Sequence, residues 1–189
     1  MRLAELAEIR MGYPFRSRLE HEPDGNVAVI QMKDIDDADL LHAQDAIRVS
    51  LPDVKARHLL RQGDLVFRSR GRSNSVALVA SPVMNAVLAA PMLLIRPRHV
   101  LPAYLHWHIN LRSTQTSLAA QAEGTAVRMI SKAALESLEV PVPDWETQRR
   151  IVETAGLAHR EHALMAEIAS KRKWLMERIL ASKAQEGTK

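Results

Sequence analysis

The sequence predicts an α+β protein: a globular domain of mixed and antiparallel strands with short helices, followed by one long C-terminal α-helix. In the first part of the chain, short apolar runs alternate with turn residues, which is typical of strands joined by tight turns. Between Gln148 and Ala181 there is no proline and a single glycine, so a continuous helix is expected. We predict a domain over residues 1–143, a helix over residues 144–182 and a flexible tail over residues 183–189.

Composition limits the class of protein. With 189 residues, 47% of them hydrophobic, the chain is long enough to bury a core. It has no cysteine, which excludes disulfides and thiol nucleophiles and agrees with a cytoplasmic location. The N-terminus lacks the apolar run of a signal peptide. Residues 76–95 are mostly apolar, but Pro82, Asn85 and Pro91 divide them into short buried strands, so no membrane association is expected.

The distribution of charge favours a polyanionic partner. The formal net charge is +4, and arginine is concentrated between Arg57 and Arg72, where Asp64 is the only acid. The planar guanidinium group forms bidentate contacts to guanine edges and phosphates. A preference for arginine codons would explain the high ratio of arginine to lysine equally well, but it explains the clustering poorly.

The N-terminal half is predicted to hold short elements. Leu3–Arg10 carries apolar residues at near-helical spacing, so a short helix that ends at Gly12 is expected. The acidic residues Asp36, Asp37 and Asp39 lack the ligand spacing of a calcium loop and predict a solvated turn. The remaining elements predicted here are strands at Val27–Met32, Ile47–Val49 and Leu65–Phe67 and a short helix at Pro52–Leu60.

The segment from residue 68 to residue 75 is the strongest candidate for nucleic-acid contact. It places arginines and small hydrogen-bonding side chains between two apolar strands, which would hold the loop while its tip adapts to a ligand. A solvated hairpin tip is the alternative interpretation. The residues that we expect to contact DNA, here and in other polar segments, are Arg16, Arg18, Lys33, Arg68, Arg70, Arg72, Ser73, Asn74 and Arg128.

The C-terminal half of the domain is predicted to be helical. Arg96–His99 reads as a second basic turn, and Pro102–Ser117 as an amphipathic helix. His106 and His108 lie two positions apart and would face nearly opposite sides of that helix, so no metal site is expected. Ser131 is predicted to cap a short helix that ends near Leu138.

A proline-rich joint precedes the long helix. Pro141 and Pro143 remove backbone donors and favour an extended chain, and Asp144 can accept a hydrogen bond from the first free amides of a helix. Trp145 would then stand in the first turn, where we expect it to anchor the joint. Domain–helix joints of no functional consequence use the same residue types.

Residues of a largely apolar seam recur along the predicted helix at steps of three and four residues. An apolar stripe on a helix of this length must be covered, either by its own domain or by another helix, and the length favours another helix. The residues that we expect at the partner-helix contact are Trp145, Ile151, Ala155, Ala158, Met165, Ile168, Leu175 and Ile179.

Sequence signatures of catalysis are missing. There is no phosphate-cradling glycine loop, no methyl-donor fingerprint and no nucleophile elbow. Pro52–Lys55 matches part of a nuclease signature, but the required second carboxylate and lysine do not follow. We therefore expect a binding module without cofactor or metal, and not an enzyme; a stand-alone nuclease is a distant alternative.

Several short motifs, in order and at matching spacing over about residues 3–180, resemble the specificity subunit of Type I restriction-modification systems. The matching segments are Leu6–Gly12, Val29–Ile35, Gly63–Val66, Gly124–Thr125, Ile130–Ser131, Leu135–Leu138, Val140–Pro143 and Gln148–Val152. Two features depart from the family. Asp144-Trp145 and Thr147-Gln148 stand where it commonly has Pro-Leu and Glu-Gln. A full-length member also carries two recognition domains and two helices, so this chain looks like half a subunit.

The resemblance implies a division of labour. The target recognition domain would read one half of a split double-stranded DNA site, and the long helix would pair with another as an antiparallel coiled coil. The assembly would dock a methyltransferase subunit that binds S-adenosylmethionine and, in some systems, a translocating restriction subunit. We expect a homodimer; pairing with another half-subunit stays open. The alternative is a regulatory protein-interaction module, a truncated decoy that acts through its helix.

Overall fold

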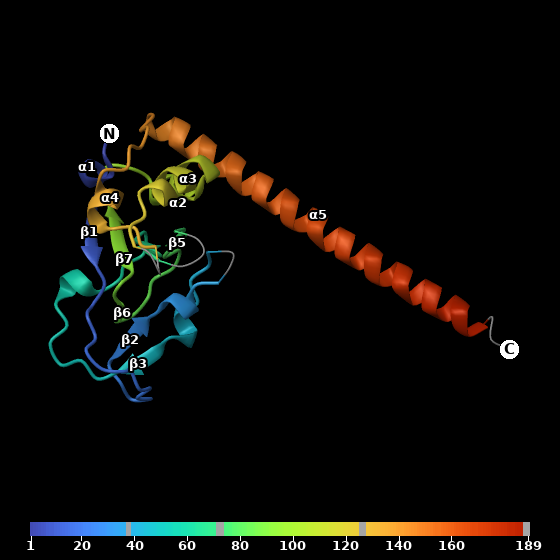
Figure 1. Ribbon diagram of the computed structural model, residues 1–189, viewed down its shortest axis with the longest axis horizontal. Coiled ribbons are helices and arrows are strands. Elements are labelled where there is room, and N and C mark those ends of the chain that lie inside the picture. The colour runs from blue at the N-terminus through green and yellow to red at the C-terminus, as the bar shows by residue number, and fades with distance from the viewer. Residues whose placement is uncertain (37–38, 71–73, 125–127, 187–189) are drawn as a thin grey trace. The chain divides into compact units, whose positions relative to one another are not determined.

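The computed structural model describes residues 1–36, 39–70, 74–124 and 128–186 (Figure 1). The chain divides into two units, Met1–Arg149 and Arg150–Lys189. The strands are β1 (Ala7–Met11), β2 (Val27–Ile30), β3 (Ile47–Val49), β4 (Leu65–Phe67), β5 (Val76–Leu78), β6 (Ala86–Leu88) and β7 (Leu93–Pro97). The helices are α1 (Leu3–Leu6), α2 (Pro102–Asn110), α3 (Arg112–Ala120), α4 (Lys132–Glu136) and α5 (Trp145–Glu186), with 3-10 turns η1 (Met32–Asp34), η2 (Ala43–Asp45) and η3 (Ala56–His58).

The first unit contains two small sheets. One has four antiparallel strands in the order β1-β7-β4-β5, and the other has three strands in the order β3-β2-β6. Strand β2 pairs antiparallel with β3 and parallel with β6, so the second sheet is mixed. The predicted α+β class with mixed and antiparallel strands is confirmed.

The main core includes apolar side chains from both sheets. Ala28 and Ile30 of β2 belong to one buried cluster with Val66 of β4 and Leu94 of β7. The alternate residues of β2, Val27 and Val29, belong to a second cluster with β3 and β6. Because strand residues alternate between faces, β2 contributes to both clusters.

The prediction of a helix over Leu3–Arg10 is wrong beyond Leu6. Helix α1 is a single turn, and the chain then becomes β1, in which Ala7 and Ile9 are buried and pair with β7. Leu3, Leu6 and Ile9 satisfy helical spacing, but the backbone hydrogen bonds available along β7 decide the outcome.

Three other predictions need correction. Pro52–Leu60 forms only η3, which lacks a side-chain cap. The helix predicted over Pro102–Ser117 is two helices, because Leu111 adopts an extended ψ of 137° between α2 and α3. Arg96 does not lie in a basic turn. It lies in β7, and its guanidinium forms two hydrogen bonds of 2.7 Å with buried Asp64.

The predicted Asp144 cap of the joint is confirmed, whereas the anchoring role of Trp145 stays a prediction. Asp144 Oδ1 accepts a 2.9 Å hydrogen bond from the Thr147 amide, which caps α5 and lowers the pKa of Asp144. Trp145 is 50% exposed, whereas Gln148 is buried and accepts a hydrogen bond from Leu101 at the start of α2. Gln148 begins one of the motifs marked in the sequence, and its contact with Leu101, which was not predicted, ties the first turn of α5 to the start of α2.

The second unit is helical. Helix α5 has 42 residues in all, which confirms the predicted continuous helix, and it extends to Glu186. Residues 187–189 of the predicted tail lie outside the described residues. No helix among the described residues is long and apolar enough to cross a membrane.

Candidate nucleic-acid interface

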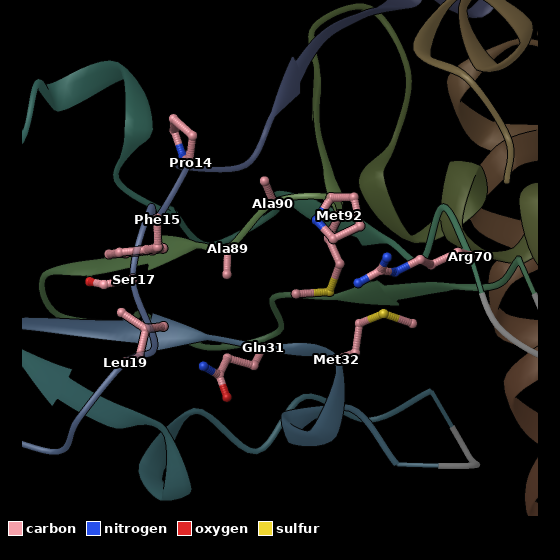
Figure 2. A pocket seen from close by; sticks show the side chains of 11 residues that line it. Pro14, Phe15, Ser17, Leu19, Gln31, Met32, Arg70, Ala89, Ala90 and Met92 are labelled. Atoms are coloured by element: carbon pink, nitrogen blue, oxygen red, sulfur yellow. The ribbon is translucent and has the colours of Figure 1, made fainter. Parts of the chain in front are cut away.

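Four chain segments that follow strands converge on one pocket of the first unit (Figure 2). They are residues 14–19 after β1, residues 31–32 after β2, Arg70 after β4 and residues 89–92 after β6. Strands β1 and β4 both run antiparallel to β7, and β2 runs parallel to β6. The pocket therefore lies at the carboxyl ends of four strands, where loops can vary without disturbing the sheets.

The pocket has a volume of about 440 Å³ and is lined by both apolar and polar side chains. Phe15, Leu19, Met32 and Met92 supply apolar surface. In Figure 2 the guanidinium of Arg70 extends toward Met32 and Met92. Side chains of this kind match base edges: arginine to guanine, glutamine to adenine and apolar groups to the thymine methyl. Gln31 supplies the amide.

Backbone contacts hold the segments of this pocket together. The Gly12 amide donates to Met92 O at 2.9 Å, and the Ala90 amide donates to Tyr13 O at 3.0 Å. A Cβ on Gly12 would lie 2.6 Å from the Ala89 carbonyl carbon, so this close approach requires glycine. The buried hydroxyl of Ser69 donates to Pro91 O at 2.8 Å and joins the loop after β4 to the segment after β6.

A further segment lies beside the loop after β4. The Ile130 amide donates to Ser69 O at 2.8 Å, and Arg70 and Met129 form an isolated antiparallel bridge. Ser131 then caps α4 by accepting from the Ala134 amide, as predicted. Ile130-Ser131, which the sequence marked as a motif, therefore supports the loop that carries Arg70.

Arg68 braces the base of this loop. Its guanidinium pairs with Asp39 and donates to the hydroxyl of Ser75, and its side chain is 12% exposed. The side-chain amide of Asn74 donates to Arg68 O at 3.2 Å. The backbone carbonyl of Asn74 accepts from the side-chain amide of Gln115 at 3.0 Å. The acidic turn is thus not simply solvated, since Asp39 holds Arg68; Asp37 lies outside the described residues.

The other predicted DNA contacts fall into three groups. Arg128 donates to the carbonyls of Ala119 and Ala122 at the end of α3, where a cation is favourable. Arg72 and Ser73 lie outside the described residues. Four further predicted cations are exposed and form no ion pair within the part of the chain that the structure describes: Arg16, Arg18, Lys33 and Arg70.

The sequence prediction missed Phe15, Leu19, Gln31 and Met92, which lie one to eight residues after the ends of β1, β2 and β6. Position after a strand is the signal that could have found them. No group of three or more His, Asp or Glu side chains suited to a metal occurs among the described residues. Burial lowers the pKa of both His106 and His108.

The chain combines a two-sheet α+β domain, which holds this pocket, with the long helix α5. The family model described as "Type I restriction modification DNA specificity domain" matches residues 1–155, and the chain belongs to this family. No curated protein sequence matches the chain.

Three solved structures share the fold. The HsdS subunit from Thermoanaerobacter tengcongensis is 24% identical, with a TM-score of 0.65, over 86% of this chain and 37% of that one. A structure of a type I R-M system complex is 20% identical (TM-score 0.71; 94% and 42% covered). The Type I restriction-modification S subunit from M. genitalium is 16% identical (TM-score 0.54; 92% and 42% covered). The chain therefore spans about two fifths of the length of these subunits.

Proposed function

We propose that this chain reads one half of a split double-stranded DNA site and docks a methyltransferase subunit, which carries the S-adenosylmethionine. In this function the chain performs no catalytic step of its own, and it acts in the cytoplasm. A restriction subunit would join in systems that have one. The proposal is carried by the convergence of four strand-end segments on a pocket that holds Arg70, which is exposed and forms no ion pair with the described residues.

The pocket supports base reading because its side chains differ in chemistry and come from separate loops. Phosphate contacts alone would need only cations, whereas an amide, a guanidinium and thioethers can discriminate among base pairs. The exposed cations Arg16, Arg18 and Lys33 lie on or next to the segments that line the pocket. They would supply phosphate contacts around it.

Helix α5 supports the pairing part of the proposal. Four large apolar side chains of the predicted contact are about half exposed, between 47% and 59%: Met165, Ile168, Leu175 and Ile179. The intervals between them along the chain are three, seven and four residues. Such a stripe is suited to a second helix, and we propose a second copy of this chain in antiparallel orientation. Ile151 and Ala155 of the predicted contact are half-buried, and Ala158 is exposed.

Methylation mapping tests the function. A strain that expresses this chain with its methyltransferase partner is expected to methylate a split, palindromic motif, because two identical domains related by a two-fold axis read an inverted repeat. An asymmetric split motif would reject the homodimer and keep DNA reading. No methylation that depends on the chain would reject both.

Two matched substitutions test the helix contact. Ile168→Asp places a charge within the stripe and is expected to shift the chain from dimer to monomer in analytical ultracentrifugation. Ser170→Asp, two positions further and so on nearly the opposite side of α5, is expected to leave the dimer intact. Equal behaviour of the two variants would contradict pairing through this stripe.

The exposed stripe also favours a second function, since α5 could bind a partner's specificity helix without any DNA reading. Such a decoy would retain helix binding when the arginines of the loop after β4 are replaced. Arg70→Ala separates the two functions: a reader loses DNA affinity, whereas a decoy shows no change in DNA binding.

A further inference from the structure

A second pocket lies on the other side of the segment that follows β1. It has a volume of about 590 Å³ and is lined by Tyr13, Pro14, Arg16, Asp53, Lys55, Arg57 and His58. Pro14 also lines the pocket that holds Arg70, so the two pockets are neighbours. Along this segment Phe15, Ser17 and Leu19 face the first pocket and Arg16 faces the second, as expected for extended backbone.

The second pocket is strongly basic. Arg16, Lys55 and Arg57 are exposed, and none of them forms an ion pair within the described part of the chain. Asp53, the one acid in the lining, is also exposed. Three unneutralised cations around one hollow create a positive potential that an anion would relieve.

The aromatic and imidazole groups give this pocket a rigid wall. The Tyr13 and His58 rings pack edge to face, with their centroids 5.7 Å apart. The centroid of the Tyr13 ring lies 5.1 Å from that of Phe15, which lines the first pocket. Arg57 Nε donates to His58 Nε2 at 3.3 Å. Burial, followed by the positive charges of Arg57, Arg10 and Lys55, lowers the pKa of His58.

We propose that this basic pocket is a phosphate-backbone site: Arg16, Lys55 and Arg57 hold a DNA phosphate while the neighbouring pocket reads bases. The inference rests on the proposed function and adds Lys55, Arg57 and His58 to it. Phosphate is favoured because three exposed cations outnumber the single carboxylate, Asp53, in the lining, and cationic donors suit a phosphate. Contacts of this kind fix position on the duplex without selecting sequence.

The site makes a prediction for His58. The charged groups around the His58 imidazole are the cations Arg10, Arg16, Lys55 and Arg57 and the carboxylate of Asp53, and the Tyr13 ring packs against it. A bound phosphate adds negative charge and so offsets the effect of the cations. The pKa of His58 therefore rises when DNA binds. Imidazole NMR signals of the full chain, titrated with and without a random-sequence duplex, measure that rise.

The test is the salt dependence of DNA binding by three forms of the full chain. Lys55→Ala/Arg57→Ala is expected to lower the slope of log Kd against log salt by about one unit, because the site holds one phosphate, and equally on the methylated motif and on random duplex. Arg61→Ala removes an exposed cation outside the pocket and is expected to keep the wild-type slope. The methylation motif of the double variant is expected to be unchanged.

Three outcomes would overturn the phosphate site, and they differ in what else they overturn. A wild-type slope and an unshifted His58 in a protein that binds DNA would overturn the phosphate site alone. Loss of methyltransferase binding with unchanged DNA binding would overturn it in favour of a protein-docking surface. A wild-type chain that binds no DNA, alone or with its methyltransferase, would overturn the proposed function together with this inference.

Discussion

The two ends of β4 use arginine in opposite ways. At the amino end, buried Asp64 accepts two hydrogen bonds from Arg96 of β7, and Arg96 also donates to Leu59 O at 2.9 Å. At the carboxyl end, Arg70 is exposed and forms no ion pair with any residue that the structure describes. Arg68 lies between these extremes, because it is paired with Asp39 at the base of the loop.

The comparison shows that a cluster of arginines is not by itself a ligand site. An arginine whose donors are satisfied inside the protein holds the fold, whereas one without a partner can satisfy its donors only with water or a ligand. Arg96 lies in β7 and Arg70 follows β4, the neighbouring strand of the same sheet, and the two arginines differ in their partners. Substitutions at the amino end of β4 should therefore change the unfolding free energy, and substitution of Arg70 beyond the carboxyl end should change DNA binding.

The largest effect is expected for Asp64→Ala. The change leaves Arg96 without its counter-charge in a site where its side chain is 17% exposed, and removes the acceptor of the Arg61 amide. Breaking such a pair costs about 3–5 kcal/mol of unfolding free energy, which urea denaturation measures. Asp53→Ala, an exposed carboxylate, serves as the control. A loss below about 1 kcal/mol for Asp64→Ala would show that this end does not hold the sheet.

A smaller loss of stability is expected for Arg68→Ala. The substitution leaves Asp39 and Ser75 without the guanidinium at the loop base, at a cost of about 1–3 kcal/mol. Arg70→Ala, two residues away, is expected to change the unfolding free energy by less than about 0.5 kcal/mol. Equal losses in urea denaturation would erase the distinction between the brace and the exposed arginine.

The smallest effect is expected from mild acid. Burial lowers the pKa of His106 and His108 in the folded state, so the unfolded state binds protons first as the pH falls. The part of the unfolding free energy that depends on these histidines is fully present above about pH 6.5, the histidine pKa of the unfolded state. It is lost as the pH falls toward the lower pKa values of the folded state. Thermal unfolding at pH 7.5 and 5.5 measures this loss, and replacing both histidines by Gln is expected to reduce it. An unchanged pH dependence in that variant would contradict the assignment.

The sequence predicted the elements that local chemistry decides. Asp144 and Ser131 cap helices where expected, and β3 and β4 occupy the predicted residues. Pairings between distant residues decided the rest. Arg96 is 32 positions from Asp64, and β1 is a strand because β7 is beside it.

The candidate site was predicted in part for the same reason. Arg16, Arg18, Lys33 and Arg70 were chosen by residue type, and the structure shows them exposed without ion pairs among the described residues. Their role in DNA contact stays a prediction. Residue type alone could not show that Arg68 and Arg128 donate to internal acceptors, since those acceptors lie on other segments.

The most direct test compares the two ends of β4 in DNA binding. Arg70→Ala and Arg61→Ala each remove one exposed arginine, the first at the pocket and the second in the turn before β4. Arg70→Ala is expected to weaken binding to the methylated motif by about 1–3 kcal/mol and to relax the preference at one base pair, while Arg61→Ala binds as wild type. Equal affinity and equal sequence preference for both variants would contradict DNA reading by the pocket.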